Sequence, residues 1–226
     1  MTARRAFGAG VGVLVAYNVA RAFGVFGDLV GLSAILLACV FLLIARSAGL
    51  DAVALGTAPA DARRGLRYGA AVFGVIAIVL VATSLISATS GLLSDSRGDI
   101  SGAELVFQIL VSTLLVTVIP EELAFRGVLL GAGTKIWSER NAVLITSACF
   151  GLWHISPTLN RELSHASSSA MQTFGAVVGT VAITFVAGVG FCWLRLRSRS
   201  LLAPIIAHLG TNGVALAAAW FVARRG

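Results

Sequence analysis

The sequence IPEELAFR, at residues 119–126, places two glutamates, a proline and an arginine inside a long apolar stretch. Charged side chains are costly at membrane depth, so ionisable residues in a spanning segment are candidates for a functional site. Glu122 and Arg126 are four residues apart, and on a helix they are expected to form an ion pair on one face. Glu121 diverges from Glu122 by about 100° and is free to act on a substrate or water. Taken alone, the same pattern also fits a helix that reaches the aqueous surface.

The composition of the whole chain indicates a membrane protein. Of its 226 residues, 58% are hydrophobic and 12% are charged, whereas soluble domains average roughly 45–50% apolar and about 25% charged residues. Apolar runs of about 18 or more residues recur along the chain, which is typical of membrane-spanning helices. The net charge of +7 could suit nucleic acid, but the arginines are spread between the apolar runs. We therefore expect membrane lipids around the protein and no nucleic-acid partner.

The expected fold is an all-α polytopic transmembrane bundle of about seven spanning helices, in one integral membrane domain over residues 1–226. Residues 1–100 hold the first three helices, and residues 101–223 form the expected core that carries the polar residues. A broken or re-entrant segment near residues 127–133 would make the count eight. The predicted helices cover residues 6–26, 29–45, 68–90, a fourth from about residue 103 that carries the glutamates, 141–155, 171–194 and 201–222.

Two details of these helices are open to test. The fifth is expected to stop before Pro157, because a residue preceding proline tends to leave the helical region, and a serine-rich loop at residues 158–170 follows. Glycines spaced four apart are expected to let helices of this chain approach closely. These pairs are Gly8/Gly12, Gly127/Gly131 and Gly175/Gly179.

The placement of arginine and lysine predicts the orientation. If the N-terminus is cytoplasmic, seven crossings place most basic loop residues inside and leave only Arg97 and Arg161 in the outer loops. Arg224 and Arg225, in the C-terminal tail, are a small violation of this pattern. The expected location is the cell membrane of a prokaryote, with the N-terminus in the cytoplasm.

Two later apolar helices also carry polar side chains. Phe150 and His154 share a face of the fifth helix, and His208 and Asn212 share a face of the seventh. Taken alone, His154 fits a histidine at the membrane interface, and His208 with Asn212 fits a hydrogen bond between helices. In combination they suggest a site, because buried polar groups are costly unless they are hydrogen-bonded.

A count along the helices tests whether these residues can meet. Glu121 lies about 16 residues before the expected turn near residue 137 and His154 about 16 after it, so both lie ~24 Å along their helices and can face each other. His208 lies only ~15 Å past its own turn, which leaves an offset of ~9 Å. The offset closes if one hairpin protrudes beyond the other.

A glutamate, two histidines and an asparagine that converge within a membrane suit the hydrolysis of an amide bond. A glutamate can take a proton from water as general base, and a histidine beside it can hold the water and relay a proton. Histidine and asparagine donors can stabilise the oxyanion that develops.

The chain resembles the CAAX protease and bacteriocin-processing family, the intramembrane glutamate proteases that include the Ras-converting enzyme. The resemblance covers residues 101–223, about half of the chain. Each motif is short, but all three occur in order on hydrophobic helices. They are Glu121-Glu122-x-x-x-Arg126, Phe150-x-x-x-His154 and His208-x-x-x-Asn212.

The resemblance implies an intramembrane endopeptidase without a metal or other cofactor. Glu121 would activate the water with the help of His154, and His208 with Asn212 would form the oxyanion hole. The substrate would be a peptide or protein cleaved near the membrane surface, either with a lipidated, CAAX-like C-terminus or in the processing of bacteriocins and other peptides. The remaining motif residues would support the site: Glu122, Arg126 and Phe150.

Two alternatives keep the same residues. One glutamate and two histidines are also the ligand set of a catalytic zinc, although the usual H-E-x-x-H signature is absent. The second alternative is a membrane protein without proteolytic activity, such as an immunity or scaffold protein. Chelator sensitivity separates the first from a glutamate peptidase, and a phenotype that survives Glu121→Gln would indicate the second. The sequence does not specify an oligomeric state.

Overall fold

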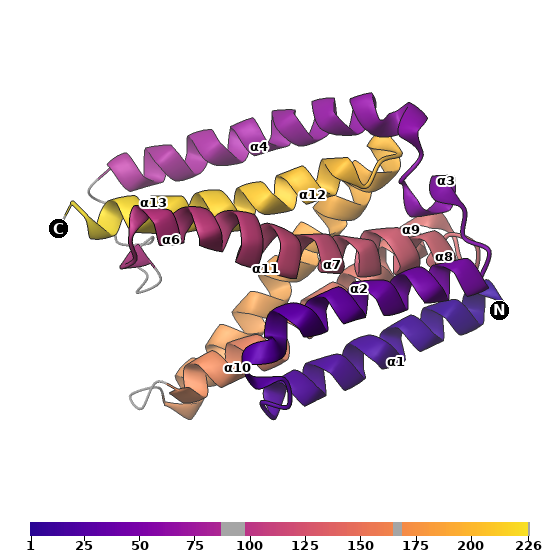
Figure 1. The fold of residues 1–226 in the computed structure, drawn as a ribbon, viewed down its shortest axis with the longest axis horizontal. Helices are drawn as coiled ribbons and strands as arrows, with labels where there is room; N and C mark the ends of the chain where they lie inside the picture. Colours follow the sequence, from indigo (N-terminus) through magenta and orange to yellow (C-terminus); the bar gives the residue numbers. More distant parts are fainter. Residues whose placement is uncertain (87–97, 165–168, 226) are drawn as a thin grey trace.

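The structure is a computed structural model that describes residues 1–86, 98–164 and 169–225. Within these ranges every regular element is a helix, which confirms the predicted all-α class. The long helices run back and forth along one axis, with the N-terminus at one end of the bundle and the C-terminus at the other (Figure 1).

The N-terminal half consists of α1 (Ala3–Ala22), α2 (Val30–Ser47), the short α3 (Ala52–Leu55) and α4 (Ala62–Leu85). Short helical turns, η1 (Gly27–Leu29) and η2 (Pro59–Asp61), precede α2 and α4. The Asp51 side chain caps α3 by accepting a hydrogen bond from the Ala54 amide at 2.8 Å. The predicted polar connection over residues 47–67 is therefore largely helical, because local caps satisfy its backbone.

A single helix without a break crosses the middle of the bundle from residue 102 to residue 133 (Figure 1). The alternative of a broken or re-entrant segment near residues 127–133, which would have raised the count to eight, is therefore wrong. Two of its stretches have π-helical hydrogen bonding, a rare form that is frequently found at functional sites. Its parts are α6 (Gly102–Phe107), π-helical η5 (Gln108–Val118), α7 (Ile119–Glu122), π-helical η6 (Leu123–Leu129) and α8 (Leu130–Gly133).

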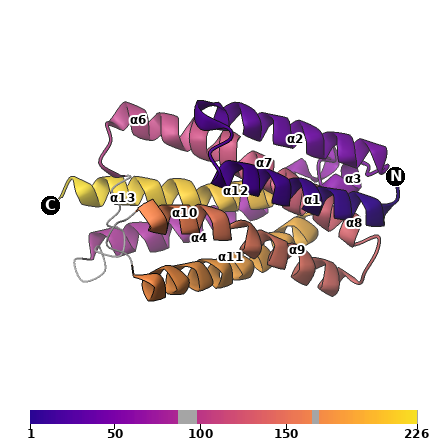
Figure 2. The same cartoon turned by 90° about the horizontal axis from the view of Figure 1, so that it is seen from below.

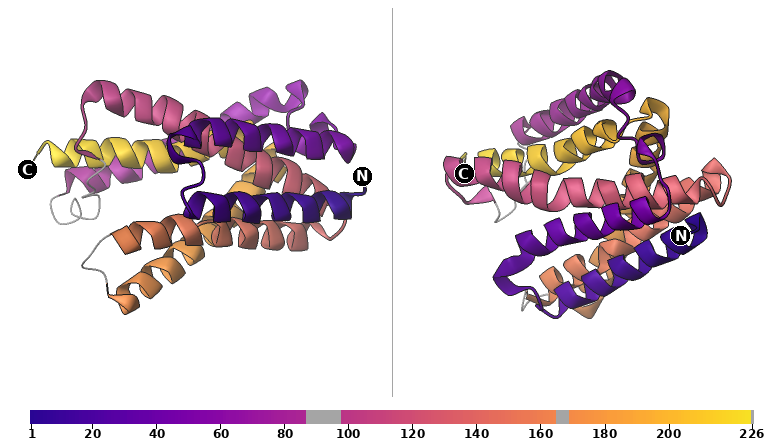
Figure 3. Two further views of the ribbon diagram at one scale, coloured as in Figure 1. Left: turned by 60° about the horizontal axis from the view of Figure 1, so that its bottom comes forward. Right: turned by 45° about the vertical axis from the view of Figure 1, so that its right-hand side comes forward.

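The C-terminal half consists of α9 (Glu139–Trp153), α10 (Ile155–Ser164), α11 (Ala170–Ser198), α12 (Leu202–Leu209), π-helical η7 (Gly210–Val214) and α13 (Ala215–Ala223). The helix expected to stop before Pro157 instead bends at His154 and continues as α10. Pro157 is the third residue of α10, and the first turn of a helix tolerates proline because its amides have no partner within the helix. Figure 2 shows α10 and the start of α11 at the same end of the bundle as the C-terminus, and Figure 3 shows both diverging from α13 at that end.

Among the described residues, six helices are long and apolar enough to cross a membrane. They cover Gly27–Ser47, Ala52–Leu85, Gly102–Gly133, Glu139–Ser164, Ala170–Ser198 and Leu202–Ala223. The seventh long helix, α1, is not among them; it carries three arginines and Asn18 in 20 residues. The protein is thus an integral membrane protein with a polytopic helical bundle, in agreement with the predicted fold class.

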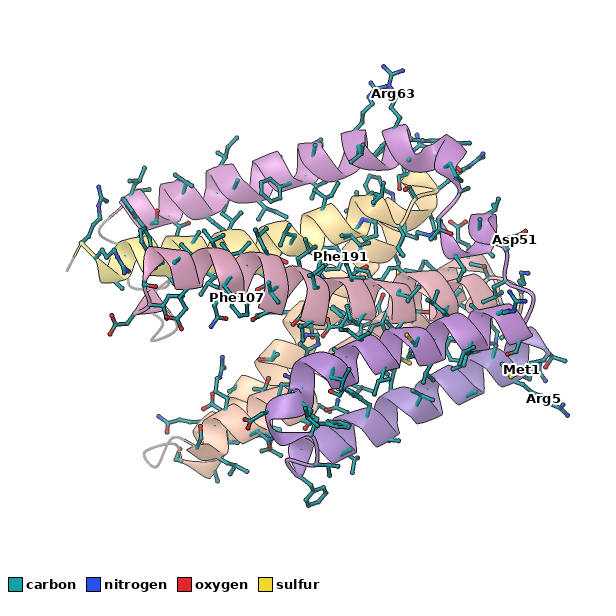
Figure 4. The ribbon with its side chains drawn as sticks, in the orientation of Figure 1. Met1, Arg5, Asp51, Arg63, Phe107 and Phe191 are labelled. Carbon is teal, nitrogen blue, oxygen red and sulfur yellow. The ribbon has the colours of Figure 1, made fainter. Side chains whose placement is uncertain are left out.

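Basic side chains concentrate at the end of the bundle that holds the N-terminus. There the Met1 amino group donates to the Ser47 carbonyl at the end of α2, and the Leu201 amide donates to the Gly56 carbonyl at 2.7 Å, which joins the segment after α11 to the segment after α3. Met1 and Arg5 lie together in Figure 4, Asp51 lies at the same end beside α3, and Arg63 points outward from α4. In the described part of the chain, the other end has Arg21, Arg161, Arg224 and Arg225.

The predicted glycine packing is partly wrong. Gly131 lies against α3, where an added Cβ would be 2.7 Å from the Ala54 carbonyl oxygen. A Cβ added at Gly8, Gly12, Gly175 or Gly179 would meet nothing within 4 Å. These four glycines lie on outward faces of α1 and α11, a property that spacing alone does not show.

Candidate active site

The two glutamates lie at the centre of the bundle, on the four-residue α7 between η5 and η6. The exposed fraction is 7% for Glu121 and 0% for Glu122, so neither reaches an aqueous surface. Pro120 precedes them and supplies no backbone donor, which suits the π-helical hydrogen bonding just upstream. The alternative of a solvated surface helix is therefore wrong.

Glu122 binds two cationic or polar partners through one oxygen. Its Oε1 accepts a hydrogen bond from Arg126 Nη1 at 2.9 Å, which is the ion pair expected from the four-residue spacing. The same Oε1 lies 2.8 Å from His208 Nδ1 on α12. Glu122 thus ties the central helix to α12.

Arg126 is fully buried and sits among aromatic rings. Its guanidinium carbon lies 4.0 Å from the ring centre of Phe150 and 4.9 Å from that of Phe191. A cation over an aromatic face is stabilised by the ring's quadrupole, more strongly when water is excluded. Arg126 Nε and Nη2 have no hydrogen-bond partner among the described residues, so the Glu122 carboxylate and these rings carry most of its stabilisation.

Glu121 is held on one side only. Its Oε1 accepts a hydrogen bond from Trp153 Nε1 at 2.9 Å. Its Oε2 is buried, has no hydrogen-bond partner in the described part of the chain, and lies 4.0 Å from His208 Nε2. A carboxylate fixed by one oxygen, with the other oxygen uncommitted, is suited to accept a proton from a water or a substrate.

His208 connects the two glutamates to Asn212. Its ring stacks on Phe191, with 5.0 Å between ring centres and 24° between planes. Because Nδ1 faces the Glu122 carboxylate, we assign a proton to Nδ1. Asn212 Nδ2 lies 3.2 Å from the other ring nitrogen, Nε2. Asn212 itself is exposed and stands on the π-helical η7, so it forms the outer edge of the site.

The offset of His208 estimated from the sequence does not separate it from the glutamates. The turn between α8 and α9 lies farther out along the bundle than the turn between α11 and α12 (Figure 1). The two hairpins are therefore displaced along their axes, and His208 reaches the level of Glu121 and Glu122.

His154 is placed differently from its prediction. It ends α9, is half-buried, and its Nδ1 lies 2.8 Å from the Phe150 carbonyl oxygen. Within the described ranges, no hydrogen bond or ion pair joins His154 to Glu121. Trp153 makes that contact instead, because successive side chains on a helix point about 100° apart and α9 turns residue 153 toward the glutamate.

The N-terminal helix supports the site, which the sequence analysis missed. Asn18 Nδ2 donates to the Trp153 carbonyl oxygen at 2.7 Å, and Tyr17 stacks on the Trp153 indole with 5.8 Å between ring centres. The Tyr17 hydroxyl is in turn 2.9 Å from Ser33 Oγ on α2. A polar Tyr-Asn pair within an apolar helix was the available signal, because such groups need partners in a membrane.

The geometry of the described side chains bears on the zinc alternative. In the part of the chain that the structure describes, no group of three or more His, Cys, Asp or Glu side chains could hold a metal ion. The Arg126 guanidinium also lies against Glu122, and its charge would repel a cation at that carboxylate.

Fold and site together define a polytopic helical membrane protein with two carboxylates, an arginine and a histidine clustered in its core. Residues 103–214 match the family model described as type II CAAX prenyl endopeptidase Rce1-like. This part of the chain is similar to that family of membrane peptidases, which agrees with the resemblance carried by the three motifs. Comparisons with curated proteins and with solved structures gave no match. The match begins in the central helix and ends in η7, so it contains every predicted site residue and leaves α1, α2 and α4 outside.

Proposed function

We propose that the protein is an intramembrane endopeptidase of the glutamate type, with Glu121 as general base. The observation that carries this proposal is the Glu121 carboxylate itself. One oxygen is fixed by Trp153 at 2.9 Å, and the other is buried, unpaired within the described residues and 4.0 Å from His208 Nε2. This arrangement orients a proton acceptor without occupying it.

The charges of the cluster support a role in proton transfer. With both carboxylates ionised, Glu121, Glu122 and Arg126 together carry one net negative charge. An uncompensated buried charge is costly. One proton shared between Glu121 and His208 Nε2 makes the four groups neutral. The site is thus built to hold a single mobile proton.

In the proposed reaction the shared proton stays on His208 Nε2, and a second proton, taken from water, passes through Glu121 in two steps. Glu121 Oε2 takes a proton from water while the water oxygen bonds to the scissile carbonyl carbon. Asn212 Nδ2–H and His208 Nε2–H donate to the oxyanion, which is stabilised before the carbon–nitrogen bond breaks. Glu121 then returns its proton to the leaving amine, so the enzyme ends in its starting state.

His154 is proposed as the second group on the water. Its Nδ1 lies 2.8 Å from the Phe150 carbonyl, and an Nδ1–H that donates there leaves Nε2 as an acceptor. Phe150 fixes this ring by an edge contact with 4.8 Å between ring centres. Phe150 also packs on Arg126, so it positions the histidine and the ion pair together.

The proposed substrate is a peptide or protein segment presented at the membrane, in keeping with the family's activity on prenylated C-termini. The basic end of the bundle is proposed to face the cytoplasm, following the usual excess of arginine and lysine in cytoplasmic loops. Processing of an unprenylated peptide, such as a bacteriocin precursor, is the second substrate class to be tested.

The test is cleavage of a peptide pool with prenylated and unprenylated C-termini by the purified protein in detergent, read by mass spectrometry. Wild type is compared with Glu121→Gln, with and without a strong chelator. The matched control is Glu104→Gln, the same substitution on the exposed start of the same helix. Asn212→Ala tests the oxyanion donor and is expected to lower kcat about 10²–10³-fold.

Chelator-resistant cleavage by wild type and Glu104→Gln, absent in a folded Glu121→Gln protein, is the expected outcome. Cleavage lost with chelator would replace the proposal with zinc catalysis. Equal cleavage by Glu121→Gln and wild type would refute the role of Glu121. If no protein cleaves the pool, a cellular phenotype that persists in Glu121→Gln would favour an immunity or scaffold role.

A further inference from the structure

A groove of about 520 Å³ lies between α9 and α11 at the basic end of the bundle, away from the proposed active site. Its rim carries four arginines from three helices and the loop that follows α11, and one carboxylate, that of Glu139. In the described part of the chain, no ion pair joins any of these arginines to a carboxylate. The rim arginines are Arg64, Arg140, Arg197 and Arg199.

The walls of the groove below this rim are apolar. Val189, Trp193 and Leu196 follow one another along α11, and Val143 with Leu144 line the α9 side. Trp193 is 56% exposed and thus faces the groove rather than the core. From Arg197 to Val189 the α11 wall extends ~12 Å along the helix, toward the middle of the membrane.

We propose that this groove binds an anionic phospholipid. The phosphate would lie among the rim arginines, and an acyl chain would lie along the α11 wall. The usual excess of arginine and lysine in cytoplasmic loops does not require a groove. Here the arginines surround a concave site whose apolar wall runs into the bilayer. Basic pockets between membrane helices at the cytoplasmic surface are suited to acidic lipid headgroups.

The pattern of charge and apolar surface selects a lipid over a soluble anion. Trp193 lies between the arginine rim and the apolar wall, and tryptophan is enriched at the membrane–water interface, where its ring lies at headgroup depth. A free phosphate ion would use the arginines but leave the ~12 Å apolar wall without an occupant. The unpaired arginines also remain accessible, since Arg140, Arg197 and Arg199 are all exposed.

The experiment is native mass spectrometry of the full chain, titrated with dioleoyl phosphatidylglycerol, with dioleoyl phosphatidylcholine as the zwitterionic comparison. The triple variant Arg140→Gln/Arg197→Gln/Arg199→Gln removes three charges from the rim. Each basic residue near a membrane surface contributes about 1 kcal/mol to binding an acidic lipid, so binding should weaken about 100-fold. The control triple removes the same charge from exposed residues at the same end: Arg4→Gln/Arg5→Gln/Lys135→Gln.

The control triple is expected to weaken phosphatidylglycerol binding less than about threefold, because these residues lie outside the groove. Equal losses in the two triples, or no loss in either, would overturn the proposal. Displacement of the lipid by millimolar glycerol phosphate would show that the groove binds a free phosphate instead.

A second measurement uses the wild-type protein and does not depend on the variants folding. A photoactivatable phosphatidylglycerol analogue is cross-linked in vesicles, and the modified peptides are mapped. Labelling of the α9 and α11 segments around Leu144 and Trp193 is expected. Labelling that is spread over all membrane-facing helices without preference would contradict a defined site.

Discussion

Glu122→Gln should destabilise the protein strongly, although the substitution removes only a charge. Glu122 Oε1 serves both Arg126 Nη1 at 2.9 Å and His208 Nδ1 at 2.8 Å, and Glu122 and Arg126 are each 0% exposed. Glutamine has nearly the same volume and keeps an amide oxygen at this place. Removing one charge of a buried pair leaves the other uncompensated, which costs about 3–5 kcal/mol.

A double variant separates the cost of the unpaired Arg126 charge from a general loss of packing. Arg126 Nε and Nη2 have no partner among the described residues, so the wild-type pair already bears an unrecovered desolvation cost. In Glu122→Gln/Arg126→Met no charge is left unpaired, and a flexible methionine can fill the space between Phe150 and Phe191. The free energy of unfolding of the double variant should therefore exceed that of Glu122→Gln alone by at least about 2 kcal/mol.

The assay is thermal and denaturant unfolding in detergent of the wild type, both single variants and the double variant. For a chain of this size 1 kcal/mol corresponds to about 2–4 °C in Tm, so Glu122→Gln should lower Tm by about 6–20 °C. Glu104→Gln, on the exposed start of the same helix, should remain within about 0.5 kcal/mol of wild type. Two results would refute the predicted role of the buried ion pair. One is a Glu122→Gln protein within about 1 kcal/mol of wild type. The other is a double variant that is no more stable than Glu122→Gln.

Two further predictions test the support of the site and the packing beside it. Trp153→Phe keeps an aromatic ring on Tyr17 but removes the donor to Glu121, so kcat should fall about tenfold or more while KM changes little; an unchanged kcat would show that the indole N–H is dispensable. Gly151→Ala places a Cβ 2.9 Å from a backbone oxygen of α11, and unfolding should show a loss of about 1–3 kcal/mol. Gly175→Ala meets nothing within 4 Å and should be neutral or stabilising by up to about 1 kcal/mol, so equal effects at the two glycines would contradict the packing.

Local chemistry in the sequence predicted several features that depend on short spacing or on overall composition. The apolar runs predicted a helical membrane bundle, because backbone groups in lipid must be hydrogen-bonded within the segment. The four-residue spacing of Glu122 and Arg126 predicted their ion pair, because the helix repeat places such residues on one face. The three motifs in order indicated the family that the comparison confirms. Their catalytic roles remain proposals.

The tertiary structure decided the features that depend on helix rotation, axial offset and partners far along the chain. Trp153 rather than His154 contacts Glu121, because the rotation of α9 is set by its packing on α1 and α11. Asn18 reaches the Trp153 carbonyl across 135 positions of sequence, and no periodicity encodes such a pairing. The apolar pattern of a membrane helix is similar on every side, so the sequence alone does not specify which face meets the core. Packing of the whole bundle makes that choice, and with it decides which polar side chains share the site.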